Sequence, residues 1–179
     1  YVGPPLWYSF VDLGYEGDLL ANLVSRYRER YQAHFLDPEP FPGVIDLLHE
    51  LHDAGLPLAT ATSKQAPMAL AQMEHLGLSS VFDVIAGATP DPASSKATVI
   101  HEALMRLEAR GADISHPAIV GDSVWDVRGA KEAGIPVIGV GWGYATEDGL
   151  DDADAVCDTV DDLRTYLLDG VAKHAQSAH

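Results

Sequence analysis

Two carboxylates in residues 118–141, AIVGDSVWDVRGAKEAGIPVIGVG, have the type and spacing that binding of a divalent metal requires. Asp122 directly follows an apolar run, and Asp126 comes one helical turn later, where a predicted strand gives way to a predicted helix. Mg²⁺ prefers one or two carboxylates, several waters and the phosphate of a substrate as ligands. The segment therefore predicts a Mg²⁺ site formed by Asp122 and Asp126.

The same segment also fits a structural role. Ser123 and Asp126 have the spacing of a capping box, and a carboxylate is favourable at the positive end of a helix. A capping box accounts for these two residues but not for Asp122, because an ionised carboxylate at a crowded strand end needs a partner. The sequence alone leaves the helix cap and the metal site as alternatives.

Lys96 is the second residue that points to a phosphate. It follows Ser95, the predicted N-cap of a helix, and so lies at the positive end of that helix. A cation costs about 0.3–1 kcal/mol there unless an anion lies nearby. Lys96 is therefore either a solvated side chain that tolerates this cost or a lysine directed at a phosphate group.

Thr62 and Ser63 end a predicted strand and form the third candidate group. Hydroxyls and free N–H groups at the junction of a strand and a helix bind phosphate, although Thr and Ser are also common helix caps. Thr62, Lys96 and the two aspartates all fall at predicted helix starts, on one edge of one sheet. Together they predict a site for a phosphate and a metal ion.

The elements that must position these residues alternate between strand and helix after the Pro-rich stretch LDPEPFPG, residues 36–43. Nearly continuous apolar strands of this kind favour a parallel sheet with helices on both faces, a Rossmann-like α/β fold. Ligands of such folds bind beyond the carboxyl ends of the strands. Strands are predicted at 56–62, 81–87, 117–121, 136–141 and 153–157, and helices at 43–54, 70–77, 95–111, 124–133 and 161–168.

The composition and charge indicate a globular protein and disfavour some classes of partner. The 179 residues are 47% hydrophobic and 21% charged, which is typical of a globular protein, and the net charge is −16. This charge disfavours nucleic acid and anionic membrane as partners. Cys157 is the single cysteine, so an internal disulfide is impossible, and a reducing, cytoplasmic location is expected. No apolar run approaches the about 18 residues of a membrane span.

Several motifs resemble those of the haloacid dehalogenase-like hydrolases, in the branch of phosphoglycolate phosphatases and 5′-nucleotidases. LATATSK resembles the second motif of that family and SSKATVI the third, while VGDSVWDVRGAKEAGI closely matches the fourth. YVGPPLWYSF and GVGWGY also look like segments of this branch. The resemblance covers nearly the whole chain and implies residues 1–40 as part of a helical cap and residues 41–179 as the α/β core.

The resemblance implies a Mg²⁺-dependent hydrolase of phosphate monoesters of small metabolites. In that family an aspartate attacks the phosphoryl group, and water hydrolyses the aspartyl-phosphate. Asp122 would be the more direct metal ligand, with Asp126 ligating or bound through water. Lys96 and Thr62 would hold the phosphate, with the N–H of Ser63 nearby. Residues 16–35 would close over the site and select the substrate.

One departure from the family is large, because the first motif, Asp-x-Asp-x-Thr, is absent from the chain. In the family it ends the central strand, so its absence would leave a gap among buried strands. We therefore expect roughly 30–45 residues, with one strand and part of the cap, to precede Tyr1.

Two alternative functions stay open beside the phosphatase. They are an inactive module that binds phosphate or a partner, and a phosphosugar mutase of the same fold. Trp142 and Tyr144 either border the site or pack against the last helix.

Overall fold

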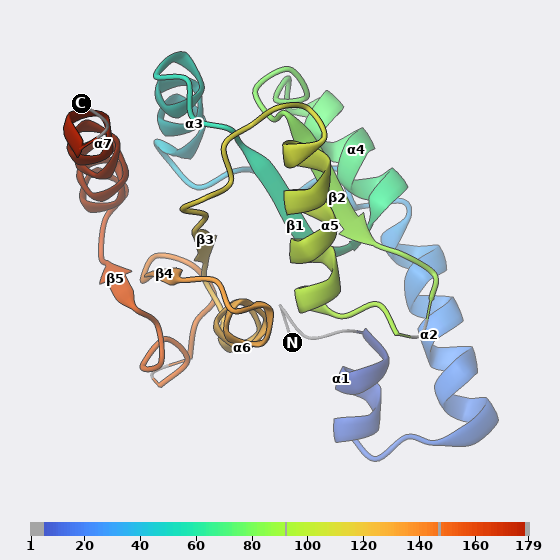
Figure 1. The fold of residues 1–179 in the computed structure, drawn as a ribbon. Coiled ribbons are helices and arrows are strands. Elements are labelled where there is room, and N and C mark those ends of the chain that lie inside the picture. The colour runs from blue at the N-terminus through green and yellow to red at the C-terminus, as the bar shows by residue number, and fades with distance from the viewer. Residues whose placement is uncertain (1–5, 92, 147, 178–179) are drawn as a thin grey trace.

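The computed structural model describes residues 6–91, 93–146 and 148–177, and their side chains as far as residue 170. Its helices and strands alternate as the sequence predicts (Figure 1). Residues 1–5 of the segment YVGPPLWYSF lie outside the described residues, and the rest of it begins a helix. The elements are α1 (Leu6–Asp12), α2 (Gly17–Tyr31), α3 (Val44–Asp53), β1 (Ala59–Gln65), α4 (Ala66–His75), β2 (Val84–Ala88), α5 (Lys96–Glu108), β3 (Ile119–Gly121), α6 (Val124–Ala133), β4 (Val137–Val140), β5 (Ala155–Cys157) and α7 (Val160–Ser177).

The strands pair in parallel, as expected, and the described strands are divided between two sheets. β1 pairs with β2, and β3, β4 and β5 pair in that order. In Figure 1 the strands follow one another across the molecule as β2, β1, β3, β4 and β5. No ladder joins β1 to β3 in the part of the chain that the structure describes. The facing edges of these two strands therefore divide the two sheets.

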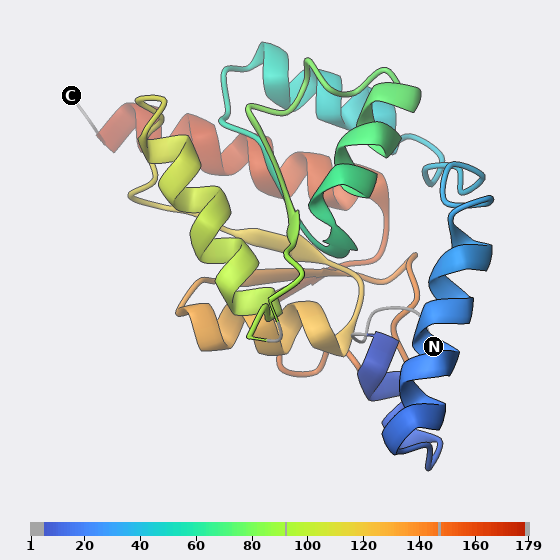
Figure 2. The same cartoon turned by 90° about the vertical axis from the view of Figure 1, so that its right-hand side faces the viewer.

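Helices cover both sheets and bury an apolar core around each. Val84 and Ala86 of β2 pack with Val99 and Ala103 of α5. Helix α4 contacts both β1 and β2. Val127 and Ala130 of α6 pack on Val137 of β4. Figure 2 shows α3 and α7 on the side of β3–β5 opposite α6. The α/β fold with helices on both faces is thus confirmed.

Cys157 at the end of β5 is 4% exposed and packs with α3 and α7. Burial and the nearby Asp162 and Asp158 raise the pKa of its thiol. The thiol therefore belongs to the apolar core between β5 and these two helices.

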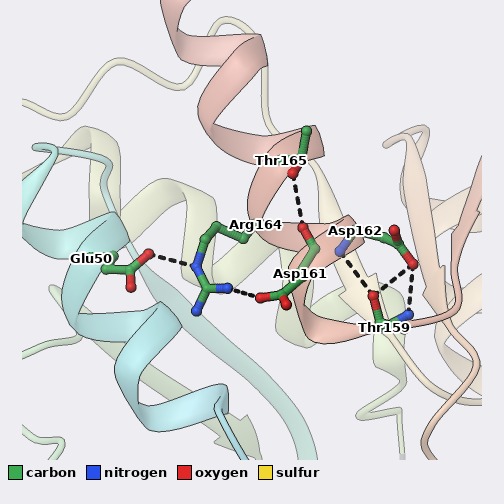
Figure 3. Close-up of polar contacts among 6 residues, drawn as sticks. All are labelled: Glu50, Thr159, Asp161, Asp162, Arg164 and Thr165. Carbon is green, nitrogen blue, oxygen red and sulfur yellow. Dashed lines mark hydrogen bonds and ion pairs between the residues drawn. The ribbon is translucent and has the colours of Figure 1, made fainter.

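Helix α7 is anchored by polar contacts at its start (Figure 3). The N–H of Thr159 donates to Asp162, whose own N–H donates to the Thr159 hydroxyl. Arg164 pairs with Asp161 on the same helix and, at 2.7 Å, with Glu50 of α3. These contacts hold α3 and α7 together on one face of the β3–β5 sheet.

Helices α1 and α2 pack on each other, and no residue of α2 is buried. Phe10 of α1 lies edge-on to Tyr27 of α2, with ring centres 6.4 Å apart. Tyr8 lies edge-on to Trp125 of α6 at 4.8 Å, so an aromatic contact joins this helix pair to the rest of the molecule. None of the described helices is long and apolar enough to cross a membrane.

Helix α5 connects the two sheets, because it packs on β1 and β2 and also on α6. Gly129 of α6 allows this approach, since a Cβ atom there would lie 2.3 Å from Cγ of Lys96. Gly129→Ala is expected to lower the free energy of unfolding by about 1–3 kcal/mol through overpacking. Urea denaturation measures this change.

The matched control is Gly170→Ala in α7, where nothing lies within 4 Å of the new Cβ. There the helix propensity of alanine should raise stability by about 0.5–1 kcal/mol. Equal effects of the two substitutions would contradict the packing role of Gly129.

Candidate active site

The centre of the candidate site is the ion pair between Lys96 and Asp126. Nζ of Lys96 lies 2.6 Å from Oδ1 of Asp126, and these side chains are only 18% and 12% exposed. Ser95 caps α5 in a complete capping box with Thr98, which places Lys96 in the first turn. The carboxylate therefore compensates the cost of a cation at a helix N-terminus.

The second oxygen of Asp126 is also occupied. Oδ2 accepts a hydrogen bond of 2.6 Å from the Ser123 hydroxyl and one of 3.3 Å from the N–H of Asp122. Ser123 caps α6, but the carboxylate of Asp126 reaches the N–H of the residue before the cap. The helix cap, one of the two alternatives from the sequence, is thus present, and the metal site stays a prediction.

Two glycines make room for this cluster, and the sequence analysis did not single them out. A Cβ atom at Gly121 would lie 2.2 Å from Cβ of Asp126, and one at Gly129 would overlap the stem of Lys96. The sequence does offer a signal for both, because Gly121 directly precedes Asp122 and Gly129 lies inside a predicted helix, where glycine is unfavourable. Both positions require glycine because backbone and side chain approach too closely for a Cβ.

Asp122 directly follows β3 and has a different environment. Its Oδ2 accepts a hydrogen bond of 3.0 Å from the N–H of Tyr144, in the loop after β4. Gly143 permits this approach, since a Cβ atom there would lie 2.3 Å from the same oxygen. The loop thus borders the site through its backbone, whereas Trp142 packs against the apolar cluster that includes Leu163 of α7.

Thr62 and Ser63 lie inside β1 rather than at a helix start, so their predicted position is wrong. The strand continues to Gln65, because a bulge between Thr62 and Gln65 lets the chain pair again with Ala88 of β2. Oγ1 of Thr62 accepts a hydrogen bond of 3.2 Å from the N–H of Lys64. Among the described residues, no hydrogen bond or ion pair joins Thr62 or Ser63 to Lys96 or to the two aspartates.

The metal site expected at Asp122 and Asp126 stays a prediction. The backbone N–H of Asp122, directly after β3, contacts the carboxylate of Asp126 in the first turn of α6, but no group of three metal-binding side chains occurs among the described residues. The oxygens of Asp126 already accept from a lysine, a hydroxyl and an N–H. Asp122 accepts from one backbone N–H, which leaves it the better placed oxygen donor for a cation.

The buried ion pair makes a stability test possible. Asp126→Asn keeps the side-chain size but removes the charge that Lys96 faces, so it should lower the free energy of unfolding by about 1.5–3 kcal/mol. Asp152→Asn is the control, because Asp152 pairs with Lys131 on the surface, 83% exposed. Its effect should be close to zero. Chemical denaturation of both variants gives the comparison, and similar losses would contradict a special role for Asp126.

Comparison with known proteins identifies relatives of this chain. A family model described as haloacid dehalogenase-like hydrolase matches residues 1–140. The chain is 36% identical to the tyrosine-protein kinase PtkA of Mycobacterium tuberculosis, over 93% of this chain and 58% of that protein. It is 37% identical to a phosphoglycolate phosphatase of Caulobacter vibrioides, over 70% of this chain and 52% of that protein. The chain thus spans little more than half the length of these relatives.

Solved structures share the fold. A predicted phosphatase from Clostridium acetobutylicum superimposes with a TM-score of 0.84 at 29% identity, covering 93% of this chain and 78% of that one. A haloacid dehalogenase-like hydrolase from Streptococcus pneumoniae gives 0.81 at 32% identity, covering 92% and 77%. The fourth-motif residues Asp122 and Asp126 and the third-motif Lys96 lie within the matched residues. On this evidence, the chain belongs to the haloacid dehalogenase-like hydrolase family.

Proposed function

We propose that the protein hydrolyses phosphate monoesters of small metabolites with the help of Mg²⁺. The observation that carries this proposal is the buried Lys96–Asp126 ion pair beside Asp122 at the carboxyl end of a parallel strand. A cation held by one carboxylate, with a second aspartate at the end of the neighbouring strand, suits the binding of an anionic substrate together with a metal ion. Several relatives bear phosphatase names, which supports the same class of reaction.

Each residue has a distinct proposed role. Asp122 would ligate Mg²⁺, and the N–H of Tyr144 fixes the orientation of its carboxylate. Asp126 would contribute to the metal site through water and holds Lys96, whose ammonium group would bind the phosphate. The hydroxyl of Thr62 and the N–H of Ser63 bind phosphate oxygens. Oxygen donors suit Mg²⁺, which would neutralise charge on the phosphoryl group during transfer.

The nucleophile in this proposal is an aspartate on a strand that precedes Tyr1 and pairs between β1 and β3. Two observations support that position: no ladder occupies the facing edges of these strands among the described residues, and Val120 of β3 is 43% exposed although it is apolar. Attack by the aspartate expels the alcohol of the ester, which takes a proton from a second aspartate two residues on. Water then hydrolyses the aspartyl-phosphate.

Residues 1–40, which include α1 and α2, form part of the cap in this proposal and help to select the substrate. Phosphoglycolate and 5′-nucleotides are the substrate classes proposed, since relatives carry both names. The relative named as a tyrosine kinase matches 93% of this chain and suggests a second candidate function. That function is the transfer of a phosphoryl group to a tyrosine hydroxyl. Cys157, a free buried thiol, fits the proposed cytoplasmic location.

A phosphate-release assay tests this function in the full-length protein. Wild-type protein with Mg²⁺ should release inorganic phosphate from p-nitrophenyl phosphate, and EDTA should abolish the release. Asp122→Asn should lower kcat/KM by about 100-fold or more, because charge stabilisation at the phosphoryl group is lost. Asp152→Asn should leave the rate unchanged.

Other outcomes identify the alternatives. Transfer of phosphate to a tyrosine peptide instead of water would indicate a kinase, and an isomeric phosphosugar product would indicate a mutase. Absence of turnover with intact Mg²⁺ binding would indicate a module that only binds phosphate or a partner.

A further inference from the structure

Lys64, which has no role in the proposed chemistry, lies where the cap helices meet the core. Its Nζ donates a hydrogen bond to Oε1 of Gln72 on α4. The same Nζ lies 5.8 Å from the centre of the Tyr31 ring, at the end of α2. Both partners are uncharged, so they orient the ammonium group of Lys64 without neutralising it.

This lack of a carboxylate distinguishes Lys64 from the other lysines with described side chains. Lys96 pairs with Asp126, and Lys131 pairs with Asp152. Because the chain has 27 acidic and only 11 basic residues, we expect a lysine that is not fully exposed to have a carboxylate partner. Among residues 6–170, the ion pairs include none for Lys64.

The backbone around Lys64 forms a β-bulge. The bulge in β1 falls between Thr62 and Gln65, and the carbonyl oxygen of Lys64 lies 2.6 Å from where a Cβ of Gly87 would be. Glycine at that position of β2 therefore permits the bulge. A bulge redirects side chains, and bulges often occur beside active sites.

Gln72 completes the arrangement from the core. It is 9% exposed, one of the buried polar residues of the described chain, and its side chain accepts from Lys64. An ammonium group has three N–H donors, so one bond to Gln72 leaves donors for another acceptor. Lys64 is thus a pre-oriented cation with capacity for an anion.

We propose that Lys64 is a specificity-determining residue that binds a second anionic group of the substrate, separate from the phosphate that is hydrolysed. The inference rests on the proposed phosphatase function and deepens it. Thr62, proposed to hold the reacting phosphate, lies two residues before Lys64 on β1, while Tyr31 belongs to the cap. A substrate with an anion at each end would therefore extend from Thr62 toward the boundary between core and cap.

The test compares two substrates in the full-length protein. Phosphoglycolate has a carboxylate besides its phosphate, whereas p-nitrophenyl phosphate has none. Lys64→Met removes the charge and keeps a long apolar stem beside Tyr31. It should lower kcat/KM for phosphoglycolate about 10- to 100-fold more than that for p-nitrophenyl phosphate, mainly through KM, because a hydrogen bond to a charged group is lost. Lys64→Arg should recover most of the difference.

The control is Lys131→Met, which removes an exposed lysine on α6 and should leave both rates unchanged. Equal loss on the two substrates, or no loss on either, would overturn the role of Lys64 while leaving the phosphatase function intact. A wild-type protein inactive on both substrates would instead overturn the phosphatase function, and this inference with it. A lowered Tm with an unchanged substrate ratio would show that Lys64 only holds cap and core together.

Discussion

The contact between Lys96 and Asp126 is the constraint on which the site and much of the packing depend. Both residues lie in the first turn of a helix, where the backbone favours an anion and disfavours a cation. Pairing at 2.6 Å satisfies both charges at once and draws the starts of α5 and α6 together. Gly129 is required because any larger residue would overlap the lysine.

The same contact joins the two sheets. Helix α5 packs on β1 and β2, and its N-terminus pairs with α6, which covers β3 and β4. Residues before β1 add to this connection, because Leu56 and Leu58 pack into the core around β4, β5 and α7. The two sheets are therefore held in one molecule by helices and apolar side chains rather than by a ladder between β1 and β3.

The environments of the two carboxylates show why spacing alone did not assign their roles. Asp126 is 9% exposed, and its oxygens accept from Lys96, Ser123 and the backbone. Asp122 accepts from the N–H of Tyr144, which lies on a different loop. One aspartate is therefore held in an ion pair, whereas the other, proposed as the metal ligand, accepts a backbone hydrogen bond from another loop. Only contacts with neighbouring elements distinguish these two roles.

The sequence by itself determined the features that depend on neighbours along the chain. The bounds of α6, Val124–Ala133, and the Ser95 cap of α5 were predicted correctly, because helix periodicity and capping are local. The alternation of strand and helix, and hence the α/β class, followed from apolar runs in the same way. The candidate residues Asp122, Asp126 and Lys96 were also identifiable from local pattern.

Tertiary structure decided how those residues meet. The extension of β1 to Gln65 depends on renewed pairing with β2 and on the close approach at Gly87, neither of which a local pattern reveals. The division into two sheets, the ion pair of Lys96 and the neutral partners of Lys64 likewise join residues far apart in sequence. Such contacts depend on how whole elements pack, and the packing is fixed by the fold as a unit.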